Sequence, residues 1–455
     1  MYTDARGLAL TTESADAATR FDRAISDYLE YRAGAMASLK SCLEADPGFV
    51  MAHVLQGYLM MLFGSNAMNS KVAASIAAAE AGAKNATDRE RAHIEALRAW
   101  LSGNLVKSNG IWDRILFEHP TDILALRLQH FNAFWMGRNQ LLRDGIARVR
   151  PAWGPDTPGY GAVLGMYAFG LEECGDYAQA EAFGREAVER NPDDLWAIHA
   201  VAHVLEMQGR ADDGLTWLSQ PANAWDDRNP FKGHVWWHTA MFALAKGEYD
   251  RVLDLYDRSI VPDPSDFYLD VQNAASMLAR LDFLGVDTGD RWTVLADMAE
   301  GRIGDHTLAF TEMHNMMVLA REGRTEQAEK LLASLRKFAK TPDHFAASTM
   351  TPIAIPLCEA ILAYGRGDYA RVIDIMLPIR YDYACVGGSH AQRDIFAQYL
   401  IEAATRDKQL PLARALLAER VALYPSNRDA WRRYADTLDA LGDPSAAEAA
   451  RRKTI

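Results

Sequence analysis

The sequence contains few cysteines, and none of them lie at the spacing of a metal site. The four are Cys42, Cys174, Cys358 and Cys385 in a chain of 455 residues. Thiols isolated in this way are typical of a reducing compartment, where disulfides are rare. We therefore expect a cytoplasmic protein whose cysteines have structural roles.

Runs of basic residues and long apolar runs are also absent. The formal net charge is −13, and an acidic surface repels nucleic-acid phosphates and anionic lipids. Gln56 and Glu359 interrupt the most apolar segments, so no run reaches the ~18 residues of a membrane-spanning helix. The N-terminal segment carries Asp4 and lacks the apolar core of a signal peptide. We expect neither nucleic acid nor a membrane among the partners.

Strand signals are scarce, and a helical repeat is present instead. Apolar helical segments end in a glycine turn that is followed by a charged residue. Glycine suits such turns because the residue after a helix is commonly left-handed. Seven of these glycines follow one another at intervals of 34 to 44 residues: Gly137, Gly175, Gly209, Gly247, Gly285, Gly323 and Gly367.

Prolines mark the ends of the second helices of several units, at Pro47, Pro120, Pro192 and Pro425. Proline just past a helix stops it. The unit is therefore helix, short turn, helix and proline loop, with ~34–40 residues, as in tetratricopeptide arrays. A generic helical bundle is the alternative, but the regular period favours an array.

We predict an all-α protein, an α-α superhelix in which antiparallel helix pairs stack into a tetratricopeptide-like solenoid. Residues 1–455 form a single repeat array, with terminal capping helices at about 1–45 and 428–455. A long and closely wound array of this kind can enclose a cavity in place of an open groove.

Longer stretches of the chain carry a family resemblance. They include VAHVLEMQG (201–209), WWHTAMFALAKGEYDRVLDLYD (236–257), RLDFLGVDTGDRW (280–292) and GGSHAQRD (387–394). Through them the chain resembles the tetratricopeptide repeat protein 38 family, as a bacterial relative, over nearly its whole length. The resemblance implies the helical-repeat fold and a shared inner surface, and it assigns no activity.

Two histidine pairs stand on the first helices of neighbouring units. His199 and His203 are four residues apart, and so are His234 and His238. Side chains at this spacing share one face of a helix. In tetratricopeptide arrays the first helix of each unit lines the concave side, so we expect both pairs to face inward.

Counting back from each turn glycine extends this inner face to other units. His238, Ser276 and His314 each lie nine residues before the glycine of their unit, and Glu172 and Glu206 each lie three before theirs. At ~100° per residue these offsets fall within about a third of the helix circumference. We expect His238, Ser276 and His314 to form a row across units, with the remaining histidines and both glutamates beside it.

The cluster has several possible uses. Two His-x-x-x-His pairs can hold a zinc ion, but here the two pairs lie about one residue out of register, so we predict no metal or other cofactor and keep metal binding as an alternative. A neutral histidine oriented by Glu206 or Glu172 is suited to acid–base chemistry. Each histidine can also be a buried hydrogen-bonding group with a structural role alone.

The segment GGSHAQRD is a second candidate site. Ser389 reads as a helix N-cap, and free N–H groups there, together with Arg393, would bind an anion. The alternative is that Ser389 only caps and Arg393 pairs with an acidic residue of the preceding unit. The aromatic residues Trp236, Trp237 and Phe310 are candidates for a pocket wall or for inter-helix packing.

We predict that the protein binds a small molecule or a short peptide terminus in a histidine-rich interior cavity. An enzyme that uses the His/Glu cluster and a protein–protein interaction scaffold are the alternatives. The sequence does not identify the ligand, a reaction or the oligomeric state. The predicted ligand-binding residues are Glu172, His199, His203, Glu206, His234, Trp237, His238, His314 and Arg393.

Overall fold

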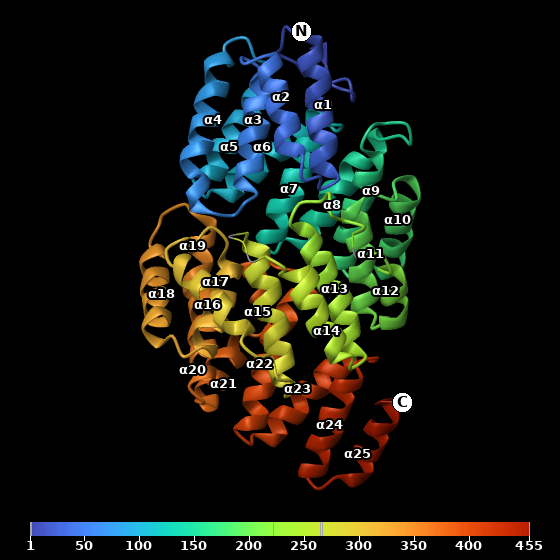
Figure 1. The fold of residues 1–455 in the computed structure, drawn as a ribbon, viewed down its shortest axis with the longest axis vertical. Helices are drawn as coiled ribbons and strands as arrows, with labels where there is room; N and C mark the ends of the chain where they lie inside the picture. Colours follow the sequence, from blue (N-terminus) through green and yellow to red (C-terminus); the bar gives the residue numbers. More distant parts are fainter. Residues whose placement is uncertain (1, 222, 264, 266, 455) are drawn as a thin grey trace.

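The chain folds into a long array of antiparallel helix pairs. The computed structural model describes residues 2–221, 223–263, 265 and 267–454. Its N-terminus and C-terminus lie at opposite ends of the longest axis (Figure 1). The all-α class and the stacked-pair architecture predicted from the sequence are thereby confirmed.

The helices of the N-terminal half follow one another as neighbouring pairs. They are α1 (Ala15–Leu29), α2 (Ala35–Ala45), α3 (Val50–Met61), α4 (Asn69–Gly82), α5 (Asp88–Leu101), α6 (Leu105–Glu118), α7 (Ile123–Trp135), α8 (Asn139–Val149), α9 (Tyr160–Glu173), α10 (Tyr177–Arg190), α11 (Leu195–Met207) and α12 (Ala211–Trp217).

The C-terminal half continues the same pattern. Its helices are α13 (Phe231–Ala245), α14 (Tyr249–Leu255), α15 (Tyr268–Phe283), α16 (Arg291–Gly301), α17 (Ala309–Arg321), α18 (Thr325–Phe338), α19 (Phe345–Thr349), α20 (Ile355–Gly365), α21 (Tyr369–Ile379), α22 (His390–Arg406), α23 (Leu410–Leu423), α24 (Arg428–Ala440) and α25 (Pro444–Arg451).

The turn between the two helices of a pair contains a residue with positive φ. The predicted turn glycines have this conformation, with φ between 62° at Gly137 and 83° at Gly175. Two pairs use another residue type at φ 59°: Tyr31 between α1 and α2, and Lys408 between α22 and α23. A side chain in this conformation clashes with its own backbone and costs roughly 1–2 kcal/mol.

The superhelix closes on itself, so that segments far apart in sequence touch. Helix α22 packs against both α11 and α15. The backbone N–H of Phe345 donates to the carbonyl of Gly103 at 2.9 Å, and the N–H of His390 donates to the Glu173 carboxylate at 3.1 Å. The inner helices are therefore buried on nearly all sides, and their polar residues must find partners inside the protein.

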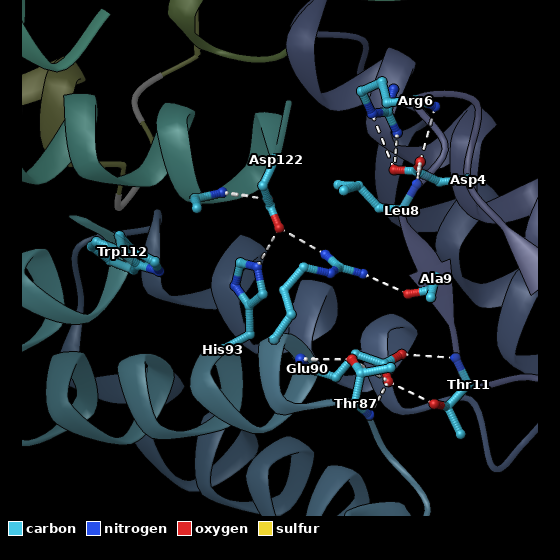
Figure 2. Close-up of polar contacts among 12 residues, drawn as sticks. Asp4, Arg6, Leu8, Ala9, Thr11, Thr87, Glu90, His93, Trp112 and Asp122 are labelled. Atoms are coloured by element: carbon cyan, nitrogen blue, oxygen red, sulfur yellow. Dashed lines mark hydrogen bonds and ion pairs between the residues drawn. The ribbon is translucent and has the colours of Figure 1, made fainter. Parts of the chain in front are cut away.

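A short hairpin precedes the helices, with β1 (Tyr2–Thr3) paired to β2 (Ala9–Leu10). A buried ionic network ties it to the array. The Arg89 guanidinium donates to Asp122 at 2.7 Å and to the carbonyl of Ala9 at 2.8 Å, and the His93 ring lies 3.0 Å from the same Asp122 carboxylate (Figure 2).

Among the described residues, the helical segment 345–365 is long and apolar enough to cross a membrane. The prediction that Glu359 leaves no segment of that length is therefore wrong. The segment comprises α19, α20 and the π-helical turn Met350–Ala354 between them. Two thirds of its most apolar window, 67%, is buried inside the protein. Burial of this kind is typical of a core helix.

Candidate functional site

A cavity of about 350 Å³ lies inside the superhelix. Its wall is built by the α1–α2 turn, the C-terminal end of α3, the inner helices α7, α9 and α11, and the beginnings of α13 and α15. Gln392 of α22 reaches it from the far end of the chain. The aromatic and histidine side chains that line it are Tyr28, Tyr31, Phe63, His130, Phe131, Phe134, Trp135, Phe169, Trp196, His199, His203, Phe231, His234, Phe267 and Tyr268.

Tyr31 connects the outer wall to the inner helices. Its ring stacks on Phe231 with centroids 4.3 Å apart and lies parallel to the ring of Trp196 at 6.1 Å. Its carbonyl accepts from the N–H of Asn229 at 2.7 Å, and the N–H of Ala33 donates to Asp227 at 2.9 Å. These two backbone hydrogen bonds join the α1–α2 turn to the loop before α13 and close this side of the cavity.

Arginine is the only charged residue type among the described residues of the lining, and three are present. Arg32 and Arg228 are both paired with the carboxylates of Asp193 and Asp227. Arg127, which is 5% exposed, makes no ion pair among the described residues.

Arg127 is held instead by aromatic side chains. Its guanidinium carbon lies 4.3 Å from the ring centroid of Trp196 and 5.3 Å from that of Tyr31, and it donates to the Tyr31 hydroxyl. The acidic residue whose charge acts on it most is Asp194, the N-cap of α11. The cavity therefore contains a buried cation that no carboxylate among the described residues pairs with.

The four inner histidines converge at one end of the cavity. One ring nitrogen of each of His199, His203, His234 and His238 lies within 4.8 Å of those of the other three. His199 and His203 bring their Nε2 atoms to 2.9 Å. His199, His203 and His234 line the cavity, whereas His238 lies behind them. The register argument made from the sequence against such a cluster is therefore wrong, since the ring nitrogens of both pairs come together in spite of their different offsets from the turn glycines.

Three of these rings face polar groups with their Nδ1 atoms. His238 Nδ1 lies 2.6 Å from the Glu206 carboxylate, and His234 Nδ1 lies 2.8 Å from Asn273 Oδ1. His203 Nδ1 faces Glu172 Oε2 at 3.7 Å. Glu206 also lines a second cavity of about 370 Å³.

Burial governs the ionisation of this region. It lowers the pKa of His199 and His203 well below the usual value, and repulsion from neighbouring rings adds to the effect. For His234 the same causes lower the pKa to about 3. Burial, followed by the charges of Glu173 and Glu206, raises the pKa of Glu172 well above its usual value. At neutral pH these three rings carry no charge, and burial favours the protonated form of Glu172.

Three of the nine predicted ligand-binding residues line the cavity, and the other six are not among the described residues of the lining: Glu172, Glu206, Trp237, His238, His314 and Arg393. His314 donates from Nδ1 to the carbonyl of Phe310 at 2.9 Å, and Ser276 likewise bonds a carbonyl of its own helix, that of Asn273. The predicted row of His238, Ser276 and His314 therefore does not face one hollow. Trp237 is fully buried beside the cluster, where its ring stacks on that of His234 with centroids 5.4 Å apart.

Arg393 also faces away from the cavity. Its guanidinium lies 3.7 Å from the Glu173 carboxylate and donates to the carbonyl of Gly388. Ser389 caps α22 in a capping box with Gln392. The contacts match the alternative interpretation of the GGSHAQRD segment as a cap and an ion-paired arginine, but the acidic residue, Glu173, lies on α9 and not in the preceding unit.

Arg127 and Trp196 were not among the predicted site residues, although their offsets from the turn glycines match those of the selected histidines. Arg127 lies ten residues before Gly137, as His199 does before Gly209. Trp196 lies thirteen residues before Gly209, as His234 does before Gly247.

Comparison with known proteins gives fold-level likenesses. No protein-family model matches the chain. A structure of human IFIT1 with m7Gppp-AAAA is 13% identical with a TM-score of 0.40, covering 98% of this chain and 95% of that one. The APC/C hetero-tetramer Cut9–Hcn1 is 12% identical with a TM-score of 0.33, covering 97% and 93%.

The tetratricopeptide domain of P58(IPK) is a further match, 12% identical with a TM-score of 0.23, covering 81% of this chain and 92% of that one. TM-scores at this level carry no argument about ligands. The resemblance to the tetratricopeptide repeat protein 38 family stays a prediction.

Proposed function

We propose that this protein binds a small organic acid with a planar, apolar body in the interior cavity. The observation that carries the proposal is Arg127, a buried guanidinium that makes no ion pair among the described residues and lies in a wall whose described residues include no acidic side chain. A buried cation is costly unless an anion pairs with it. A ligand carboxylate would supply that partner in a two-pronged hydrogen bond.

The rest of the wall suits an apolar ligand body. Aromatic rings from several helices line the cavity, and its volume of about 350 Å³ is within the range of small-molecule sites. The indole N–H groups of Trp135 and Trp196 are buried and have no hydrogen-bond partner among the described residues, so they are available to ligand acceptors. The C-terminus of a short peptide with an aromatic last residue belongs to the same chemical class.

The test measures binding of aromatic carboxylic acids, each paired with its own amide, by calorimetry. Indole-3-acetate against indole-3-acetamide and benzoate against benzamide are suitable pairs. We expect the acid to bind at least about tenfold more tightly than the amide, since a charge-assisted hydrogen bond contributes about 1.5–3 kcal/mol. Equal binding of acid and amide, or no binding of any pair, would contradict the proposal.

Arg127→Met removes the charge at similar volume. We expect the preference for the acid to disappear, while the free energy of unfolding without ligand stays the same or rises, because an unpaired buried charge is lost. Arg32→Met is the matched control, since Arg32 lines the same cavity but is already paired with acidic residues. We expect it to change affinity by less than about fivefold.

A further inference from the structure

We propose that His199, His203, His234 and His238 together bind one divalent transition-metal ion, of which Zn²⁺ fits the geometry best. The site lies in the wall of the interior cavity, and its test does not depend on the organic ligand proposed above.

The spacing of the ring nitrogens matches a tetrahedral site. At Zn–N distances of 2.0–2.1 Å, neighbouring ligand nitrogens are about 3.3 Å apart. Here His199 Nε2 and His203 Nε2 are 2.9 Å apart, and the four ligand atoms all lie within 4.8 Å of one another. Binding of one ion would require rotation of the rings about their side-chain bonds, so that the four nitrogens approach this tetrahedral spacing.

Hydrogen bonds at Nδ1 leave the Nε2 atoms of two of these rings free for a metal ion. Glu206 accepts from His238 Nδ1 at 2.6 Å, and Asn273 accepts from His234 Nδ1 at 2.8 Å. A histidine that donates from Nδ1 presents a lone pair on Nε2, and metal-bound histidines nearly always have such a partner. Two of the four rings are therefore held in the tautomer that a metal requires.

Several ring nitrogens of the four histidines have no hydrogen-bond partner among the described residues. His238 is fully buried, and its Nε2 has no hydrogen-bond partner among the described residues. The Nδ1 atoms of His199 and His203 are equally without one there. Buried polar atoms without partners cost about 1–3 kcal/mol each, and a metal ion would use the lone pair of His238 Nε2 directly.

The ligand set selects the kind of metal. Four imidazoles suit Zn²⁺, Ni²⁺, Cu²⁺ and Fe²⁺, whereas Mg²⁺ and Ca²⁺ require oxygen ligands. Three of the four histidines also line the cavity, so a bound ion would be reached from its interior.

The experiment uses the full chain after treatment with a chelator, titrated with Zn²⁺ alone in competition with a chromophoric chelator. We expect one ion per chain and a rise of the melting temperature with Zn²⁺ concentration. Co²⁺ in place of Zn²⁺ should give the intense visible bands of tetrahedral coordination, and the zinc absorption edge should show nitrogen neighbours with imidazole scattering. Absence of stoichiometric binding, or a shell of water oxygens, would overturn the proposal.

Variants locate the ion. His199→Asn together with His238→Asn should weaken Zn²⁺ binding at least 100-fold, and Glu206→Gln, which keeps the side-chain shape, should weaken it about 10- to 100-fold. His314→Asn is the control, because His314 is a buried histidine outside the cluster, and it should leave the Zn²⁺ affinity unchanged. If the double variant does not fold, Glu206→Gln is the test variant. An unchanged Zn²⁺ affinity in Glu206→Gln would contradict the proposed metal site.

Discussion

At the scale of the residue, Tyr31 shows how the cavity wall depends on an unfavourable backbone conformation. It has φ 59° at the turn position where most units have glycine. Its ring stacks on Phe231, and its hydroxyl accepts from Arg127. Non-glycine residues persist in this conformation where the surrounding structure holds them, often at functional sites.

Tyr31→Gly should therefore separate binding from stability. We expect affinity for an aromatic acid to fall at least about tenfold, since a buried aromatic anchor is lost. The free energy of unfolding should fall by less than the lost packing of the ring alone would cost, because relief of roughly 1–2 kcal/mol of backbone strain opposes that cost. Calorimetry and urea unfolding measure the two quantities.

Lys408→Gly is the matched control for that experiment. Lys408 has the same φ of 59°, is exposed and lies outside the cavity lining. We expect unchanged ligand affinity and a free energy of unfolding that is unchanged or raised by up to about 1 kcal/mol. A loss of affinity in this variant would show that Tyr31→Gly acts through the turn backbone alone.

The candidate site was predictable from the sequence only where it follows the repeat. His199, His203 and His234 were selected because their offsets from the turn glycines put them on inner faces, and they do line the cavity. The same count placed His314 in the row, but it is turned toward its own helix. Offsets give the face of a helix, whereas the direction of a ring depends on packing between neighbouring units.

At the scale of the element, one side chain at the start of α7, Asp122, both caps the helix and forms a buried ion pair. Asp122 accepts from the N–H of Ala125 at 3.0 Å as the N-cap. It also pairs with Arg89 and His93 in the network of Figure 2. Burial alone would raise the pKa of Asp122, but His93 and Arg89 lower it far below the usual range.

Asp122→Asn keeps a capping group and removes the charge, leaving Arg89 buried without its partner. We expect a loss of about 3–5 kcal/mol in the free energy of unfolding at pH 7. Because the carboxylate has a lowered pKa in the folded state, its contribution is complete above the unfolded pKa of about 4 and is lost as the pH falls below it. Urea unfolding at several pH values should show the two proteins converging under acid.

The comparison variant for this helix end is Asp443→Asn. Asp443 caps α25 by accepting from the N–H of Ala446 at 3.0 Å, and it is exposed. Since asparagine caps as well as aspartate, we expect less than about 0.5 kcal/mol of change. A similar loss at both positions would mean that the cap, and not the buried ion pair, dominates at Asp122.

At the scale of the whole molecule, the contacts that close the superhelix could not be predicted from the repeat spacing. The period, the turns and the proline loops all followed from sequence spacing. The approach of the α7–α8 turn to the segment 383–386 did not, because it depends on how far each unit rotates relative to the last. A Cβ added at Gly137 would lie 1.9 Å from the carbonyl oxygen of Ala384.

Gly137→Ala should therefore force the two halves apart. We expect a loss of about 2–5 kcal/mol, made up of backbone strain and overpacking, with a larger radius of gyration in X-ray scattering. Gly247→Ala carries the same backbone strain at φ 77° but meets nothing within 4 Å. It should cost only about 1–2 kcal/mol and leave the radius unchanged.

The span of the cavity wall, from Tyr28 to Gln392, has a consequence for synthesis on the ribosome. Repeat arrays can fold unit by unit as they emerge, since each unit contacts its neighbours alone. Here the early units present Arg127 and the histidines to water until α22 is translated and docks. We therefore expect a stage in which most units are folded but the cavity is still open, and the proposed ligand would bind only after α22 has docked.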